Sequence, residues 1–225
     1  SNRRNPARDR PGAFEFLFLV AILWFEEEKP NAIVWEAGIG GRYDPVRTVK
    51  SRLGVLTGLE LEHTQILGAT EELIAYDKID AVAPGGSLVV SPSVQPVHRE
   101  RIETFCNLAA KHPVFVDDAF DVGSIHNTAD GTSFIARGHK VMLNLIGRHQ
   151  VDNALTAFLA AARWLDVTPD FAKQPRLLEA ISKTSWPGRL ERVATKPDLW
   201  IDVGHTPKAL DLVTSAFLDF TPREK

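Results

Sequence analysis

Short apolar runs alternate along the chain with stretches of helical pattern, and this alternation limits the possible folds more than any other feature. The apolar runs lack polar residues at every second position, and they lie at residues 32–37, 53–57, 88–91 and 114–116. Such runs are typical of strands that are covered on both faces. Helical patterns precede or separate them, at residues 14–28, 70–82 and 96–111. The alternation therefore predicts an α/β fold with a mostly parallel sheet and helices on both faces.

The pattern changes in the second half of the chain. Residues 134–145 are expected to form a β-hairpin around Arg137-Gly138-His139. An amphipathic helix is expected at residues 151–165, where apolar residues recur at helical spacing. Further elements are expected beyond it, with a helix at 176–184, strands at 190–194 and 199–203, and a last helix at 207–220.

Local composition and a Pro-Gly break predict that the chain consists of three parts, a tail and two domains. The first dozen residues hold four arginines and two prolines and are expected to be a disordered, solvated tail, residues 1–12. Trp186-Pro187-Gly188 interrupts the helical and strand patterns, so a main domain is expected at 13–187. Residues 188–225 are expected to be the beginning of a second, incomplete α/β domain.

Charge and cysteine content exclude several classes of protein. The net charge of -3 gives no electrostatic footprint for nucleic acid or an anionic membrane. A single cysteine, Cys106, excludes a disulfide scaffold and a metal site built from cysteines, and it fits a reducing compartment. The longest apolar run, 16–25, is shorter than the roughly 20 residues that span a bilayer, so it is expected to be a buried helix. We therefore expect a cytoplasmic protein without nucleic-acid or membrane partners.

Ligands of parallel α/β sheets bind beyond the carboxyl ends of the strands, which directs attention to the loop that follows residues 32–37. This loop reads Glu36-Ala-Gly-Ile-Gly-Gly-Arg42. Its three glycines permit close approach of a ligand, and a carboxylate at position 36 can reach a metal ion. The alternative is a simple Gly-rich turn in which Glu36 pairs with Arg42. The spacing does not match the dinucleotide-binding fingerprint.

A second cluster follows the run at 53–57 and contains Glu60, Glu62 and His63. A neutral imidazole there can ligate a divalent cation, whereas the alternative is the start of a surface helix with solvated acids. Lys78 lies in the helix that follows, flanked by Asp77 and Asp80. By itself it reads as a solvated lysine in salt bridges.

Two loops in the second half also carry polar residues at helix starts. Asp202 ends the last expected strand and could bind a ribose hydroxyl or orient a base, or it could lie in a turn before an N-cap at Thr206. Asn153 and His149 lie on one face of a helix, where the alternative role is capping. Asp117-Asp118 could hold a metal or close a loop.

Together these segments resemble the Mur ligase superfamily, and most closely its folylpolyglutamate synthetase / dihydrofolate synthase branch. The order and approximate spacing of the motifs match over nearly the whole chain after the tail. The matching segments are Phe14-Glu-Phe16, Glu36-Ala-Gly-Ile-Gly-Gly-Arg-Tyr-Asp44, Leu61-Glu-His63, Ile66-Leu-Gly68, Ile74-Ala-Tyr-Asp-Lys78, Gly147-Arg-His-Gln150 with Asn153-Ala154, Pro187-Gly-Arg-Leu-Glu191 and Asp202-Val-Gly-His205.

The resemblance implies a fold and an activity. The fold is a central domain like that of P-loop NTPases, followed by a smaller Rossmann-like domain. The implied enzyme is an ATP-dependent acid–amino-acid ligase. ATP phosphorylates the carboxylate of a folate or dihydropteroate, and the amine of glutamate attacks the acyl phosphate. ATP and Mg²⁺ are the implied cofactors, because magnesium neutralises charge between the two anions. The expected oligomeric state is a monomer.

The resemblance also assigns roles to residues around the phosphates. Glu36 and His63 match magnesium ligands. Lys78 matches a lysine that becomes carbamylated and then resembles a carboxylate ligand. Our central hypothesis is that these three residues converge around one divalent-cation pocket at the rim of the sheet.

Four further residues match positions that contact the nucleotide. Asn153 is expected to face the adenine. Arg189 and Asp202 are expected to contact the nucleotide, and His205 is expected to lie near the γ-phosphate.

The sequence also departs from the family pattern. The family's Gly-rich Lys-Ser/Thr loop does not occur in these 225 residues, so we expect a fragment or impaired relative that binds ATP weakly. The family's Asp-Ala-Thr-Asn reads Asp44-Pro-Val-Arg47. His205-Thr206-Pro207 is closer to the peptidoglycan-ligase branch. Two alternatives therefore stay open, a peptidoglycan-type Mur ligase and a non-catalytic nucleotide-binding or interaction protein.

Overall fold

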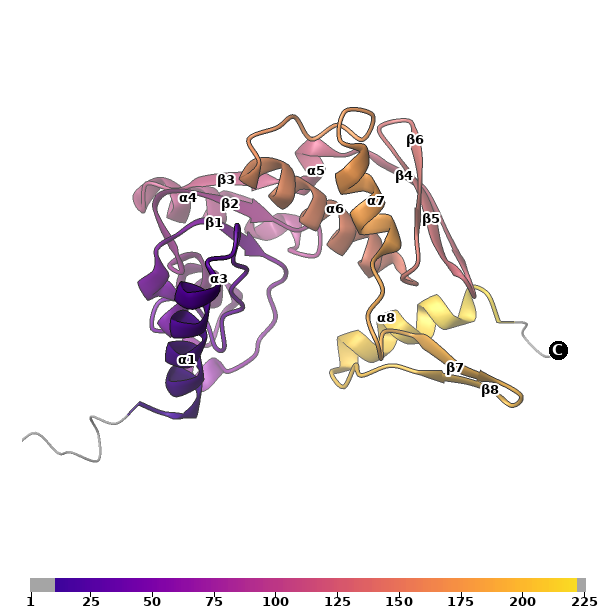
Figure 1. Cartoon of the computed structure of the whole chain (residues 1–225), viewed down its shortest axis with the longest axis horizontal. Coiled ribbons are helices and arrows are strands. Elements are labelled where there is room, and N and C mark those ends of the chain that lie inside the picture. Colours follow the sequence, from indigo (N-terminus) through magenta and orange to yellow (C-terminus); the bar gives the residue numbers. More distant parts are fainter. Residues whose placement is uncertain (1–10, 222–225) are drawn as a thin grey trace, which may run out of the picture. The chain divides into compact units, whose positions relative to one another are not determined.

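A computed structural model describes residues 11–221 of the chain, so most of the expected tail at 1–12 lies outside the described residues (Figure 1). The chain divides into two compact units. The first unit comprises the chain up to Gly54 together with Glu60–Ser87 and His98–His112. The second comprises Val55–Leu59, Leu88–Val97 and the chain from Pro113 onward. The expected domain boundary between residues 187 and 188 stays a prediction.

The mostly parallel sheet that the alternation predicts is present. Its strands are β1 (Ser51–Leu56), β2 (Val82–Val90) and β3 (His112–Phe115), in the order β1-β2-β3. Two helices, α3 (Glu71–Ile79) and α4 (Arg99–Leu108), alternate with these strands along the chain. The α/β class is therefore confirmed.

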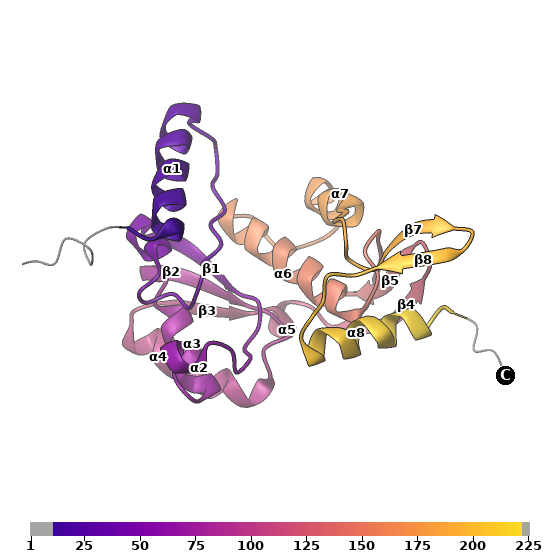
Figure 2. The same ribbon diagram turned by 90° about the horizontal axis from the view of Figure 1, so that it is seen from below.

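The helices α3 and α4 lie side by side in the first unit (Figure 2). Each helix buries apolar residues almost completely, Ile74, Ala75 and Ile79 on α3 and Ile102 and Cys106 on α4. Burial raises the pKa of the Cys106 thiol to about 11, so this cysteine is an inert core residue. Thr70 caps α3, since its Oγ1 accepts a hydrogen bond from Leu73 N at 3.3 Å.

Two segments of the first unit, residues 32–37 and 70–86, differ from what the sequence predicts. Residues 32–37 form no strand, and the Val34 side chain is 95% exposed. A strand requires a neighbour for its backbone hydrogen bonds, and no strand in the described part of the chain pairs with this segment. The helix expected at 70–82 ends at Ile79, and Pro84-Gly85-Gly86 lies inside β2. The strand continues through these residues because β2 pairs with both β1 and β3, and Gly85 N also donates to Ala110 O at 2.5 Å.

The helix expected at 14–28 is present as α1 (Ala13–Glu28), but it is mostly exposed. It packs through Phe18 and Phe25 on Trp35, at ring distances of 4.8 and 5.3 Å. Most of its other large apolar side chains are exposed, so the expected buried helix is corrected to a surface helix. Across residues 11–221, every helix is too short or too polar to cross a membrane.

The second unit contains an antiparallel sheet of β4 (Val122–Thr128), β5 (Gly131–Ala136) and β6 (His139–Leu143). The expected hairpin around Arg137-Gly138 joins β5 to β6. The sequence did not predict β4. Helix α6 (Arg148–Trp164) covers the expected amphipathic stretch, and all five of its predicted apolar positions are buried, Val151, Leu155, Phe158, Leu159 and Ala162. Two shorter helices of this unit are α5 (Val116–Ala119) and α7 (Pro175–Lys183).

The last described segment also belongs to the second unit. It consists of the hairpin β7 (Glu191–Thr195) and β8 (Asp198–Ile201), followed by α8 (Pro207–Leu218). Leu190 and Ala216 share a small core with Ile146, which lies two residues before the start of α6. This core fixes the loop around Asp202 to the start of α6.

Candidate functional site

The Gly-rich loop of the first unit is held at one end by the carboxylate of Asp44. Asp44 Oδ2 accepts hydrogen bonds from Gly38 N at 2.8 Å and Ile39 N at 3.2 Å. Its Oδ1 accepts from Val46 N at 2.9 Å and caps the 3-10 helix η1 (Pro45–Val49). The side chain is buried. One carboxylate therefore connects the start of the loop to the turn that follows it.

The other end of the loop is held by Asp77 of α3. Asp77 Oδ1 accepts hydrogen bonds from Gly41 N at 2.8 Å and from Arg42 N at 3.2 Å. Gly40 has a φ of +68°, and a side chain there would overlap Asp77 Oδ1 and lie 2.5 Å from Leu67 Cδ2. The loop, α3 and the short helix α2 (Thr64–Leu67) therefore meet at these glycines.

Arg42 pairs with Asp80 rather than with Glu36. Its Nε donates to Asp80 Oδ2 at 3.0 Å, and its guanidinium lies 4.1 Å from the centre of the Tyr76 ring. Lys111 Nζ, which is buried, donates to Asp80 Oδ1 at 3.0 Å. Burial alone would raise the pKa of Asp80, but the hydrogen bonds from Lys111 and Arg42 hold it below its ordinary value. The alternative of a Glu36–Arg42 ion pair is therefore wrong.

The three residues predicted to surround a cation lie on segments that meet. Glu36 is exposed at the start of the Gly-rich loop. His63 is exposed directly before α2, and Lys78 is partly buried on α3 beside Asp77. The convergence of the three side chains on one ion remains a hypothesis.

The donor set fits magnesium in part. Among the described residues, no three His, Cys, Asp or Glu side chains lie close enough to hold a metal ion. Magnesium commonly takes only one or two carboxylates together with waters and substrate phosphates, so the exposed carboxylate of Glu36 suits it. The imidazole of His63 is more typical of transition metals. Lys78 becomes an oxygen donor only if its amine is carbamylated.

The four residues predicted to contact a nucleotide all lie in the second unit. Asp202 Oδ2 accepts from Leu190 N at 2.8 Å and its Oδ1 accepts from Gly204 N at 2.6 Å, so Arg189 is held beside the Asp202 loop. Asn153 Nδ2 donates to Gln150 Oε1 at 3.2 Å on α6. His205 is exposed, and its Nδ1 lies 3.2 Å from Val203 O. Both carboxylate oxygens of Asp202 therefore already accept hydrogen bonds from backbone N–H groups, which agrees with the alternative interpretation that Asp202 lies in a turn.

Two other polar side chains of the second unit, Thr206 and His149, lie at the starts of helices. Thr206 Oγ1 accepts from Ala209 N at 3.2 Å and caps α8, which confirms that alternative for Thr206. His149, on the first turn of α6, has a buried Nδ1 without a hydrogen-bond partner among the described residues. Burial lowers the pKa of His149, and the charge of Arg189 lowers it further against the opposing effect of Asp202. The imidazole is therefore a neutral group close to both charged residues.

Sequence reasoning gave no site role to Asp44 or Asp77. Both are carboxylates that accept backbone N–H groups of a turn, a role in which Asp is common. For Asp44 this signal was readable, because Asp44 lies three residues after the last glycine of the loop. The role of Asp77 depends on a contact across 36 positions of the chain, which no local pattern reveals.

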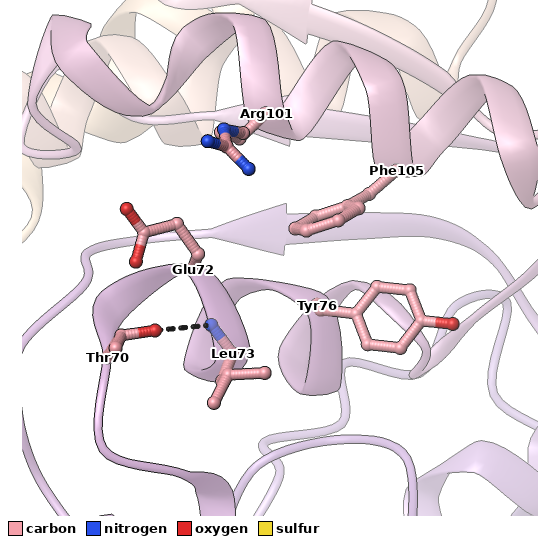
Figure 3. A pocket seen from close by; sticks show the side chains of 6 residues that line it. All are labelled: Thr70, Glu72, Leu73, Tyr76, Arg101 and Phe105. Atoms are coloured by element: carbon pink, nitrogen blue, oxygen red, sulfur yellow. Dashed lines mark hydrogen bonds between the residues drawn. The ribbon is translucent and has the colours of Figure 1, made fainter.

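Two open hollows lie on the first unit. One, of about 570 Å³, lies between α3 and α4 and places the Tyr76 and Phe105 rings edge to face at 4.8 Å, with Glu72 and Arg101 beside them (Figure 3). None of the predicted site residues lines it. The other, of about 560 Å³, borders the Gly-rich loop and is lined by Glu15, Arg42, Tyr43, Asp44, Pro45, Arg47 and Thr48.

Comparison with known proteins gives consistent matches. The description of the Mur ligase middle domain matches residues 19–161. The dihydrofolate synthase/folylpolyglutamate synthase of Bacillus subtilis (strain 168) is 30% identical over 212 residues, which cover 90% of this chain and 48% of that protein. The mitochondrial folylpolyglutamate synthase of Bos taurus is 28% identical over 89% of this chain and 36% of its own length.

Solved structures agree with these matches. The apo form of L. casei FPGS matches 97% of this chain and 54% of its own with a TM-score of 0.84 at 22% identity. At that identity the likeness shows the fold alone. The chain spans about half the length of the curated Bacillus relative.

Proposed function

Since the chain belongs to the Mur ligase family, on its folylpolyglutamate synthase branch, we propose that it acts in an ATP-dependent ligase that joins glutamate to a folate or pteroate carboxylate. The observation that carries the proposal is the 30% identity to the Bacillus dihydrofolate synthase/folylpolyglutamate synthase across 90% of this chain. A stretch that covers 90% of the chain includes the Gly-rich loop and α3. A cytoplasmic monomer without nucleic-acid or membrane partners is part of the same proposal.

The chain's own residues divide into two groups in this proposal. Glu36, His63 and, once carbamylated, Lys78 of the first unit would hold Mg²⁺, which when bound neutralises charge between the phosphate and the acid. Asn153 would orient the adenine, and Arg189 and Asp202 would hold the rest of the nucleotide. His205 would lie near the γ-phosphate. In the ligation, the acid carboxylate takes the γ-phosphoryl group and the glutamate amine then displaces phosphate.

The test is ligation by the natural full-length protein. It is incubated with ATP, Mg²⁺ and glutamate, with dihydropteroate or a reduced folate as the acid, and ADP and the glutamyl product are measured by mass spectrometry. A parallel arm offers muramyl nucleotides as acids, since His205-Thr206-Pro207 favours a peptidoglycan-type substrate. Glutamylated pterin and equimolar ADP support the proposal. A product only from muramyl nucleotides would move the chain to the other branch, and no ATP turnover with any acid would favour the non-catalytic alternative.

Lys78 gives a prediction that does not require turnover. With ¹³C-bicarbonate at alkaline pH, the protein is expected to show one carbamate carbonyl resonance, because a partly buried amine beside the loop is sheltered from bulk water. The resonance should disappear in Lys78→Gln and persist in Lys50→Gln, whose lysine is exposed. A spectrum without a carbamate at any bicarbonate concentration would leave Lys78 an ordinary lysine.

A further inference from the structure

Most backbone N–H groups of the Gly-rich loop already have partners within the protein. Asp44 accepts those of Gly38 and Ile39, and Asp77 accepts those of Gly41 and Arg42, all at 2.8–3.2 Å. A glycine-rich loop that cradles phosphate must present its N–H groups to the anion. This loop directs four of them to buried carboxylates instead. These hydrogen bonds fix the backbone of the loop and so the position of the side chains that it carries. Glu36 is the carboxylate at the start of the loop.

Asp77 connects this loop to the helix turn that carries Lys78. A side chain at Gly41 would lie 2.6 Å from Lys78 O and 2.8 Å from Asp77 O, so the loop backbone rests directly on the last turn of α3. The Asp77 side chain is 8% exposed and bonds to the loop at the same point. Loss of this carboxylate would remove the backbone hydrogen bonds between the loop and α3 and leave only the Arg42 side chain on Asp80 and Tyr76, while Asp44 would still hold the start of the loop.

We propose that Asp77 is a positioning residue: by holding Gly41 and Arg42, it fixes the Glu36 carboxylate relative to Lys78 and so sets the affinity of the site for a divalent cation. This inference rests on the proposed function, which makes Glu36 a cation ligand. Groups that orient metal ligands without binding the metal typically change the metal affinity about 10–100-fold when they are removed. Asp77 touches neither the substrate nor the ion in this proposal.

The first measurement tests, in the absence of metal, whether Asp77 holds the backbone of Gly41 and Arg42. Amide hydrogen exchange of the metal-free chain is compared between wild type, Asp77→Ala and Asp77→Asn. In Asp77→Ala, the Gly41 and Arg42 amides should exchange at least about tenfold faster, because their acceptor is gone. The Gly38 and Ile39 amides, held by Asp44, should change less than about threefold. Asp77→Asn keeps a side-chain oxygen that can accept both bonds, so protection should return.

The second measurement tests the effect on the ion. The Kd for Mn²⁺, used in place of Mg²⁺, is measured by electron paramagnetic resonance well below the unfolding temperature. We expect the Kd to rise about tenfold in Asp77→Ala and to stay within about threefold in Asp77→Asn. Ile102→Val, a change at a fully buried residue of the same unit, should lower stability and leave the Kd unchanged. Glu36→Gln should weaken binding in every background.

The outcomes separate this inference from the proposed function. If wild type binds Mn²⁺ and Glu36→Gln weakens it, but Asp77→Ala leaves the Kd unchanged, the positioning role is overturned and the metal site stands. Equal exchange of all four loop amides in wild type and Asp77→Ala would also overturn it. A wild-type chain that binds no Mn²⁺ contradicts the cation role of Glu36 in the proposed function. The exchange data then still decide whether Asp77 holds the backbone of Gly41 and Arg42.

Discussion

Asp80→Ala is expected to destabilise the protein by about 3–5 kcal/mol, the cost of leaving a buried charge without its partner. The side chain of Lys111 is 2% exposed, and its Nζ has two acceptors at 3.0 Å, Ile79 O and Asp80 Oδ1. Without the carboxylate, the ammonium keeps a single carbonyl. Arg42 also loses its partner, but it is partly exposed and can be hydrated. Urea unfolding followed by circular dichroism measures the loss.

A double-mutant cycle identifies Lys111 as the cause. Lys111→Met removes the buried charge and keeps most of the stem volume, so it should cost less than Asp80→Ala. In the Lys111→Met background, Asp80→Ala should then cost about 1 kcal/mol or less, since only exposed partners remain. If Asp80→Ala costs the same in both backgrounds, the buried pair is not what stabilises this end of α3.

Glu36→Gln is expected to lower the rate of ligation about 10³-fold in the full-length protein while leaving the fold intact. The substitution keeps the shape of the side chain and removes the charge that the proposed function assigns to cation binding. Glu36 is exposed, so its effect on stability should stay within about 0.5 kcal/mol. Initial rates of ADP release at saturating ATP measure the change.

Glu27→Gln is the matched control for this prediction. Glu27 is also an exposed glutamate, on α1, and lies outside both groups of candidate residues. Its loss should leave the rate within about twofold of wild type. Raised Mg²⁺ should restore part of the Glu36→Gln rate if the defect is in cation binding. An unchanged rate in Glu36→Gln would remove this residue from the reaction.

The elements that the sequence predicted well are those whose signal is local. The apolar positions of α6 recur every three to four residues. The hairpin at Arg137-Gly138 is indicated by its own turn residues and the short apolar runs beside them. The caps at Thr70 and Thr206 likewise depend on a side chain and an N–H group three positions apart. Such patterns predict an element without knowledge of what surrounds it.

The features that the sequence missed depend on distant partners. Residues 32–37 have the composition of a strand, but strand formation needs a neighbouring backbone, and Val34 remains exposed. The hydrogen bonds of Asp77 to the Gly-rich loop and the pairing of Arg42 with Asp80 cross more than 30 positions. The sequence pattern correctly placed Lys78 on a helix and Asp202 after the last strand, whereas the strand expected before the Glu36 loop is absent. The carboxylates that hold those loops required the structure.

The most direct test of the account is the position of one bound ion. Crystals of the protein grown with Mn²⁺ and bicarbonate are measured at a wavelength where manganese scatters anomalously. The account predicts a single strong peak within coordination distance of oxygens from Glu36 and the modified Lys78, with His63 beside it. A peak bound elsewhere, with these three side chains pointing to different surfaces, would contradict the shared cation site.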